Sequence, residues 1–120
     1  MAQEFANITE ITHACEAFVI SLEEERYYDA HEDLEPLWFS RRFEENDEVK
    51  LWKGFINAAV SFELVKRGRH EASLKAWKNY HKYRELLGKF ETDHYEMYVR
   101  MVKIIEKQDS RLRGNDERES

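Results

Sequence analysis

His31 and Glu35 are four residues apart in the stretch YYDAHEDLEPLW, which spans residues 27–38. On a helix, this spacing places two side chains one above the other on the same face. An imidazole nitrogen and a carboxylate oxygen held in this way suit zinc, manganese or iron as ligands. The pair is therefore a candidate chelate for a divalent metal ion.

The same stretch separates into two faces when it is drawn as a helix. The side chains of Trp38 and the apolar residue Leu34 project from the helix in nearly the same direction, and those of His31 and Glu35 lie toward that side. The opposite face is expected to be solvated and holds Asp29, Glu32, Asp33 and Pro36. We therefore predict that His31 and Glu35 turn toward the core beside Trp38.

A further carboxylate and a further histidine extend this cluster. Glu63 falls within the apolar arc of residues 48–67, where a carboxylate is costly unless it is paired, hydrogen-bonded, protonated or bound to a cation. His81 lies on a stripe of the following segment together with apolar residues. We predict a ligand-binding pocket formed by His31, Glu35, Trp38, Glu63 and His81, with His31, Glu35 and Glu63 as the metal ligands.

Two interpretations of the cluster stay open from the residues alone. In the first, it binds a divalent metal or a small ligand, and a metal-bound water would make the protein a metal-dependent hydrolase. In the second, the inward His and Glu side chains form a structural hydrogen-bond network, and the protein is a non-enzymatic helical interaction module. Neither a catalysed reaction nor a substrate follows from these residues.

Familiar catalytic motifs receive little support. The residues His31-Glu32-x-x-Glu35 resemble the zinc-protease motif with its last histidine replaced, but Glu32, which would have to act as the general base, lies on the solvated face. The chain contains no G-x-S-x-G elbow and no phosphate-binding glycine loop. These patterns disfavour a zinc protease, a serine hydrolase and a nucleotide-binding protein.

The elements that must position the cluster are helices, because four Gly and one Pro leave little turn material for a sheet protein. Apolar periodicity predicts five of them, at residues 8–22, 26–42, 48–67, 70–87 and 93–108. The third is apolar over about half of its circumference, which is typical of a central helix. We therefore expect an all-α, single-domain bundle over residues 1–108, followed by a polar, disordered tail at 109–120.

Composition limits the partners and the location of the protein. The formal net charge is -6, and no basic face is evident, so we expect no nucleic-acid binding. No signal peptide and no membrane span are evident, which predicts a cytoplasmic protein without a membrane partner. Cys15 lies on an apolar stripe and is expected to be a buried, inert thiol. The broadly apolar fifth helix makes it a candidate homodimer surface.

The motif around His31, Glu35 and Trp38, followed by the apolar run that begins at Gly54, resembles the signature of domain-of-unknown-function family 309. The resemblance covers about residues 24–88, and the members of this family are small bacterial and archaeal helical proteins. It implies an all-α bundle, a prokaryotic source, a signature suspected of binding metal, and no established activity. The chain departs from the pattern at Glu63, where the family tends to carry histidine. It also departs at Pro36, which should kink the helix after Glu35.

Overall fold

The protein is described here by a computed structural model that covers residues 2–114, with side chains for residues 8–113, and this part of the chain contains helices but no strand. Five α-helices follow one another: α1 (Ala2–Glu23), α2 (Tyr27–Ser40), α3 (Asp47–Lys66), α4 (His70–Arg84) and α5 (Tyr95–Asp109). A short π-helical turn, η1 (Ser110–Gly114), continues α5. The all-α prediction is confirmed.

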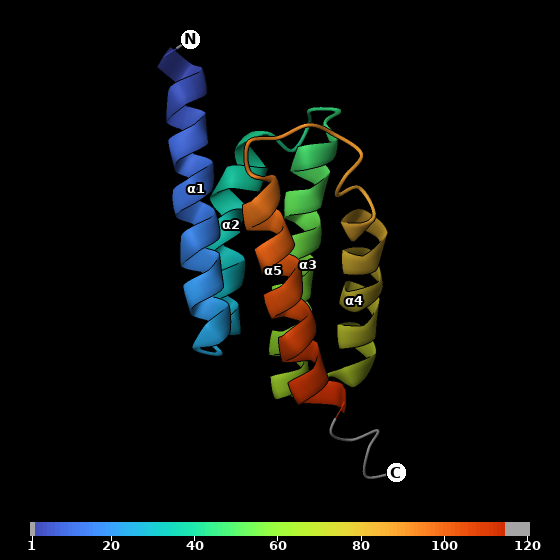
Figure 1. Ribbon diagram of the computed structural model, residues 1–120. Coiled ribbons are helices and arrows are strands. Elements are labelled where there is room, and N and C mark those ends of the chain that lie inside the picture. The colour runs from blue at the N-terminus through green and yellow to red at the C-terminus, as the bar shows by residue number, and fades with distance from the viewer. Residues whose placement is uncertain (1, 115–120) are drawn as a thin grey trace.

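The first four helices form a layer in which each helix packs against the next one in the sequence. α5 lies in front of this layer, running alongside its helices between α1 and α4, and contacts α1, as Figure 1 shows. This arrangement surrounds α3, and its large side chains Trp52, Phe55 and Phe62 are fully buried. The helix expected at the centre of the bundle is therefore α3.

The ends of α3 follow from local sequence signals. Asn46 precedes the helix, and its side-chain oxygen accepts hydrogen bonds from the amides of Glu48 at 2.8 Å and Val49 at 3.2 Å. This satisfies two of the amides that a helix start leaves without partners. Gly68 follows the helix with a φ of 76°, a left-handed conformation that glycine adopts without strain.

Gly54 allows α3 and α4 to approach each other closely. A Cβ atom at this position would lie 2.7 Å from the Cβ of Tyr83 in α4. Two carbon atoms that are not bonded do not come so close, and the Cβ of Tyr83 is fixed to the backbone of its helix. The glycine that begins the apolar run of α3 is therefore required by helix packing.

All five helices differ somewhat from their predicted extents, most of all α1, which begins at Ala2 rather than at residue 8. α4 ends at Arg84 rather than near residue 87, because the amides of Leu86 and Leu87 bond three residues back, to Tyr83 and Arg84, in a tight turn. α2 runs from Tyr27 to Ser40 with Pro36 inside it as one element. Pro36 removes one amide donor from the helix without dividing it in two.

Part of the segment that was expected to be a disordered tail is helical. Asp109 ends α5, and the next five residues form η1. The side chain of Leu112 packs against the core. The rest of the expected tail, residues 115–120, lies outside the described residues.

α5 uses its apolar residues within the monomer. Tyr98, Met101 and Ile105 have no accessible surface, because they pack into the common core. The apolar breadth of this helix is thus accounted for by its position in front of the layer. A homodimer through α5 stays a prediction.

Cys15 is fully buried in α1. Burial raises the pKa of its thiol to about 12, with a smaller contribution from the carboxylate of Glu48. Since the thiolate is the reactive form, this thiol is unreactive near neutral pH.

Candidate functional site

His31 and Glu35 form a direct contact on α2. The distance between His31 Nε2 and Glu35 Oε2 is 3.0 Å, and His31 Nδ1 lies 3.3 Å from the backbone carbonyl oxygen of Tyr28. Both ring nitrogens therefore face an acceptor. A neutral ring carries one N–H, so it can donate to only one of these two acceptors at a time.

The two side chains differ in burial. The side chain of His31 is 20% exposed and that of Glu35 is 50% exposed. His31 is thus partly buried, as expected, whereas Glu35 lies nearer to solvent than the helical projection indicated. The ring of Tyr28 packs beside that of His31, with 5.5 Å between the centroids.

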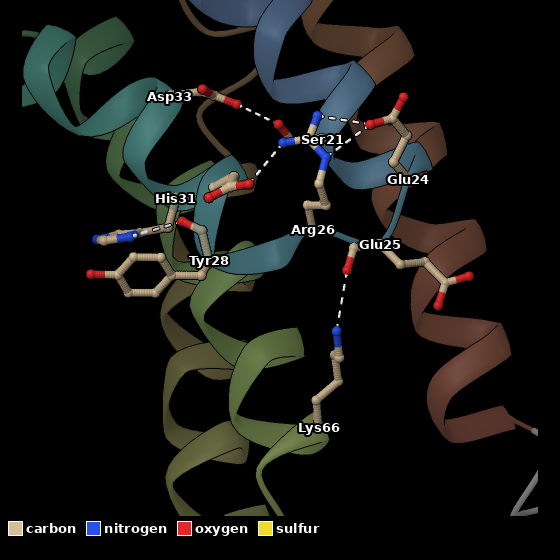
Figure 2. A network of polar contacts seen from close by, with 9 residues as sticks. Ser21, Glu24, Glu25, Arg26, Tyr28, His31, Asp33 and Lys66 are labelled. Carbon is tan, nitrogen blue, oxygen red and sulfur yellow. Dashed lines mark hydrogen bonds and ion pairs between the residues drawn. The ribbon is translucent and has the colours of Figure 1, made fainter.

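Asp33 is not one of the freely solvated acids that were expected on α2. It is partly buried and accepts a hydrogen bond of 2.7 Å from the hydroxyl of Ser21, a buried residue of α1. Figure 2 shows this contact away from the neighbouring rings of Tyr28 and His31. One face of α2 is therefore bonded to α1, while another presents Tyr28 and His31.

The charge of Glu63 is compensated at the C-terminal end of α3. Its carboxylate accepts a hydrogen bond of 2.7 Å from Nε of Arg67, the residue that caps this end of the helix. The Glu63 side chain is 20% exposed and that of Arg67 is 58% exposed. A partly buried carboxylate in an otherwise apolar arc is thus explained by an i, i+4 ion pair.

A pocket of about 170 Å³ lies between α2 and α3. It is lined mostly by apolar atoms and is bounded by Tyr27, Tyr28, His31, Val60, Glu63, Leu64 and Arg67. Tyr27 is buried and donates a hydrogen bond of 2.7 Å to the side-chain oxygen of Gln108 in α5, and burial raises the pKa of Tyr27 to about 12. The pocket thus combines one neutral buried phenol with charged groups nearer to solvent.

The structure brings together only some of the sequence-predicted residues. His31 and Glu63 line the same pocket, and Glu35 contacts His31. Trp38 packs elsewhere, with the Lys53 ammonium 4.1 Å from the centroid of its ring. His81 is exposed on α4, and its ring lies edge-on to that of Trp77 at 5.0 Å. Neither Trp38 nor His81 lines this pocket.

The three proposed metal ligands are arranged as two separate pairs, His31 with Glu35 and Glu63 with Arg67. Among the described residues, no three His, Cys, Asp or Glu side chains gather where they could hold a metal ion. The donors that do lie side by side are one imidazole nitrogen and one carboxylate oxygen. The assignment of His31, Glu35 and Glu63 as metal ligands stays a prediction.

Sequence reasoning left five of the residues that line this pocket outside it, namely Tyr27, Tyr28, Val60, Leu64 and Arg67. The spacing of Glu63 and Arg67 was a usable signal, since oppositely charged residues four apart on a helix commonly pair. Tyr28 and Leu64 had no comparable signal. Their position in the pocket depends on how α2 packs against α3.

A comparison of the chain with known protein families matches the region that contains α2 and α3. The model of the family described as a domain of unknown function, DUF309, matches residues 15–76, which is just over half of the chain. The chain belongs to the DUF309 family. The matched region contains α2, α3 and all the residues that line the pocket, whereas His81 lies beyond it.

Membership in DUF309 confirms the resemblance inferred from the sequence, although the match begins and ends earlier than residues 24–88. The family description assigns no activity. No curated protein and no solved structure matches the chain. None of the helices within residues 2–114 combines the length and the apolar character needed to cross a membrane. The chemistry of the site itself is therefore what indicates the function of the chain.

Proposed function

We propose that this DUF309 protein is a non-enzymatic helical interaction module that binds a partner chain at the pocket between α2 and α3. The observation that carries the proposal is the pocket itself, with apolar walls and charged residues beside them. An apolar cavity of ~150 Å³ is large enough to hold benzene. The pocket of about 170 Å³ therefore suits one aromatic or branched side chain of a partner.

The charge of α2 indicates what should flank that side chain. Glu32 and Glu35 follow Tyr28 and His31 by one helical turn, so they lie on the same face of the helix as these pocket residues. Both glutamates are exposed. A basic residue next to the apolar anchor of the partner would lie close to these carboxylates, and the net charge of -6 favours the approach of a basic segment.

The ion pairs on the two helices fit a binding role. Arg67 is engaged by Glu63, so these two charges compensate each other without a ligand, and His31 is held by its contact with Glu35. The apolar walls formed by Val60, Leu64 and the ring of Tyr28 are then free to contact an apolar side chain. In this account the His-x-x-x-Glu pair shapes one edge of a recognition pocket.

A titration with three capped dipeptide amides tests this proposal. The probes are acetyl-Trp-Arg-amide, acetyl-Trp-Glu-amide and acetyl-Gly-Arg-amide, and two-dimensional amide NMR spectra are recorded on the full chain. We expect acetyl-Trp-Arg-amide to shift the resonances of Tyr28, His31 and Leu64, and to bind at least about tenfold more tightly than either other probe. Shifts of equal size with all three probes, or shifts elsewhere only, would show that the pocket doesn't select an apolar anchor beside a basic group.

We infer a divalent-metal site at His31 and Glu35 as a second candidate function, supported by the placement of the imidazole. Metal-binding histidines commonly direct their other ring nitrogen to a backbone carbonyl, and His31 Nδ1 faces Tyr28 in this way. The second ring nitrogen lies 3.0 Å from Glu35, so a zinc, manganese or iron ion could bind both groups. Solvent or substrate would have to complete the coordination, and the metal-dependent hydrolase hypothesis depends on this site.

Metal analysis of untagged protein purified without chelator tests this second candidate. It predicts about one metal ion per chain, lost in His31→Ala and retained in His81→Ala. His81 is the matched control because it is an exposed histidine on α4, outside the pocket. A folded, metal-free wild-type protein, or equal loss of metal in both variants, would rule out a site at His31.

A further inference from the structure

Arg113 of η1 extends to two buried serines, one on α3 and one on α4. Its Nη2 atom donates hydrogen bonds to the hydroxyl oxygens of Ser61 and Ser73, the latter at 2.7 Å. Its Nη1 atom donates to Asp109 at 2.6 Å. The Arg113 side chain is 20% exposed, so most of the guanidinium group is inside the protein.

The two serines form an acceptor pair without help from Arg113. The hydroxyl of Ser61 donates to the carbonyl of Ser73 at 2.8 Å, and the hydroxyl of Ser73 donates to the carbonyl of Ser61 at 2.9 Å. Both hydroxyls can therefore donate to backbone atoms, and the two hydroxyl oxygens are only 2.9 Å apart. Their remaining lone pairs need a donor, and the two hydrogens of one guanidinium NH₂ group supply both bonds.

Aromatic rings form the walls of the same site. The guanidinium carbon of Arg113 lies 4.7 Å from the ring centroid of Trp77 and 5.9 Å from that of Phe62. Cations near the faces of aromatic rings are attracted to them, and a planar guanidinium also stacks on such rings. Two adjacent acceptors, aromatic walls and the carboxylate of Asp109 together match a guanidinium better than a compact ammonium.

We propose that α3 and α4 form a preformed guanidinium-binding site. In this structure the site is occupied by Arg113 of the same chain, and when Arg113 leaves, the site can bind the arginine side chain of a partner. The acceptors and the aromatic walls belong to α3 and α4, while the present occupant belongs to η1. η1 is a five-residue turn that continues α5, so displacement of this turn would vacate the site without unfolding the helices that build it. This site is separate from the α2–α3 pocket.

Titration of the full-length Arg113→Ala variant with methylguanidinium chloride tests the proposal, with methylammonium chloride as the probe of equal charge. The readouts are the indole N–H resonance of Trp77 and the melting temperature. We expect methylguanidinium to shift the Trp77 resonance and raise the melting temperature of the variant, with the millimolar affinity typical of so small a ligand. Methylammonium should bind at least about tenfold more weakly, and wild-type protein should show no saturable shift at Trp77.

Two further variants complete the test. Replacing Ser61 and Ser73 by alanine in the Arg113→Ala background should abolish the response to methylguanidinium, because the acceptor pair is lost. Arg113→Lys keeps the positive charge but lacks the planar guanidinium group that bonds both serines. This variant should therefore have a lower melting temperature than wild-type protein. The proposal is overturned by an absent response in Arg113→Ala, by equal responses to the two ions, by an unchanged response in the serine variant, or by a wild-type melting temperature in Arg113→Lys.

Discussion

Replacing Phe62 by alanine is expected to lower the free energy of unfolding by about 3–5 kcal/mol, the range found for large aromatic residues in protein cores. Phe62 has no accessible surface. Its ring centroid lies 5.3 Å from that of Tyr27 in α2 and 5.6 Å from that of Trp77 in α4. The ring therefore joins three helices, and its loss removes apolar contacts and leaves a cavity between them.

Phe43→Ala provides the matched control for Phe62→Ala. Phe43 undergoes the same chemical change, but it belongs to the segment that connects α2 to α3, and 87% of its surface is exposed. Its removal should change the free energy of unfolding by no more than about 0.5 kcal/mol. Urea unfolding followed by circular dichroism measures both values, and similar losses for the two variants would contradict the central packing role of Phe62.

Replacing Tyr98 by phenylalanine is expected to destabilise the protein by about 1–3 kcal/mol through the loss of one hydroxyl group. The Tyr98 oxygen accepts a hydrogen bond of 2.8 Å from the indole N–H of Trp52 and donates one of 2.5 Å to Glu48. Burial raises the pKa of Tyr98, and the hydrogen bond to Glu48 raises it further, so the phenol stays neutral and able to donate. In the variant, the buried N–H of Trp52 would lose this acceptor.

Tyr95→Phe is the control for the loss of a hydroxyl on the same helix. Tyr95 is 48% exposed, so water can solvate its hydroxyl in both the folded and the unfolded state. Its replacement should be nearly neutral. If the unfolding free energies of the two variants depend equally on urea concentration, the difference between their urea midpoints isolates the contribution of the buried network. A Tyr98→Phe midpoint equal to that of Tyr95→Phe would mean that Trp52 and Glu48 find other partners.

The helices were predictable because their signals are local in the sequence. The apolar pattern of residues 48–67, with Asn46 before it and Gly68 after it, corresponds closely to α3. By contrast, the end of α4 at Arg84 depends on turn bonds that no periodicity reveals. Element types therefore followed from patterning, while some boundaries depended on how the chain turns.

The contacts of the site were predictable mainly within single helices. The four-residue spacing of His31 and Glu35 correctly indicated that they meet, since both are on α2. A helical projection does not reveal which neighbouring helix faces a residue. In the structure, Glu63 lines the same pocket as His31 and is paired with Arg67, the residue that follows α3. Its assignment as a metal ligand with His31 and Glu35 stays a prediction.

The serine site illustrates what neither composition nor periodicity can reveal. Ser61 and Ser73 are twelve positions apart on different helices, and their contact depends on the packing of α3 against α4. Arg113 belongs to a segment whose polar composition predicted a disordered tail. Its role follows only from the position of η1 beside the two serines.

The most direct test of the interaction-module account is the affinity of acetyl-Trp-Arg-amide for a variant whose α2–α3 pocket is filled. Val60→Trp places a large side chain at a residue that lines the pocket, whereas Leu74→Trp makes a comparable change at an exposed position of α4. The account predicts that Val60→Trp, with a wild-type circular dichroism spectrum, binds the peptide at least about tenfold more weakly, while Leu74→Trp binds it as wild-type protein does. Equal affinities of wild-type protein and a folded Val60→Trp variant would contradict the account.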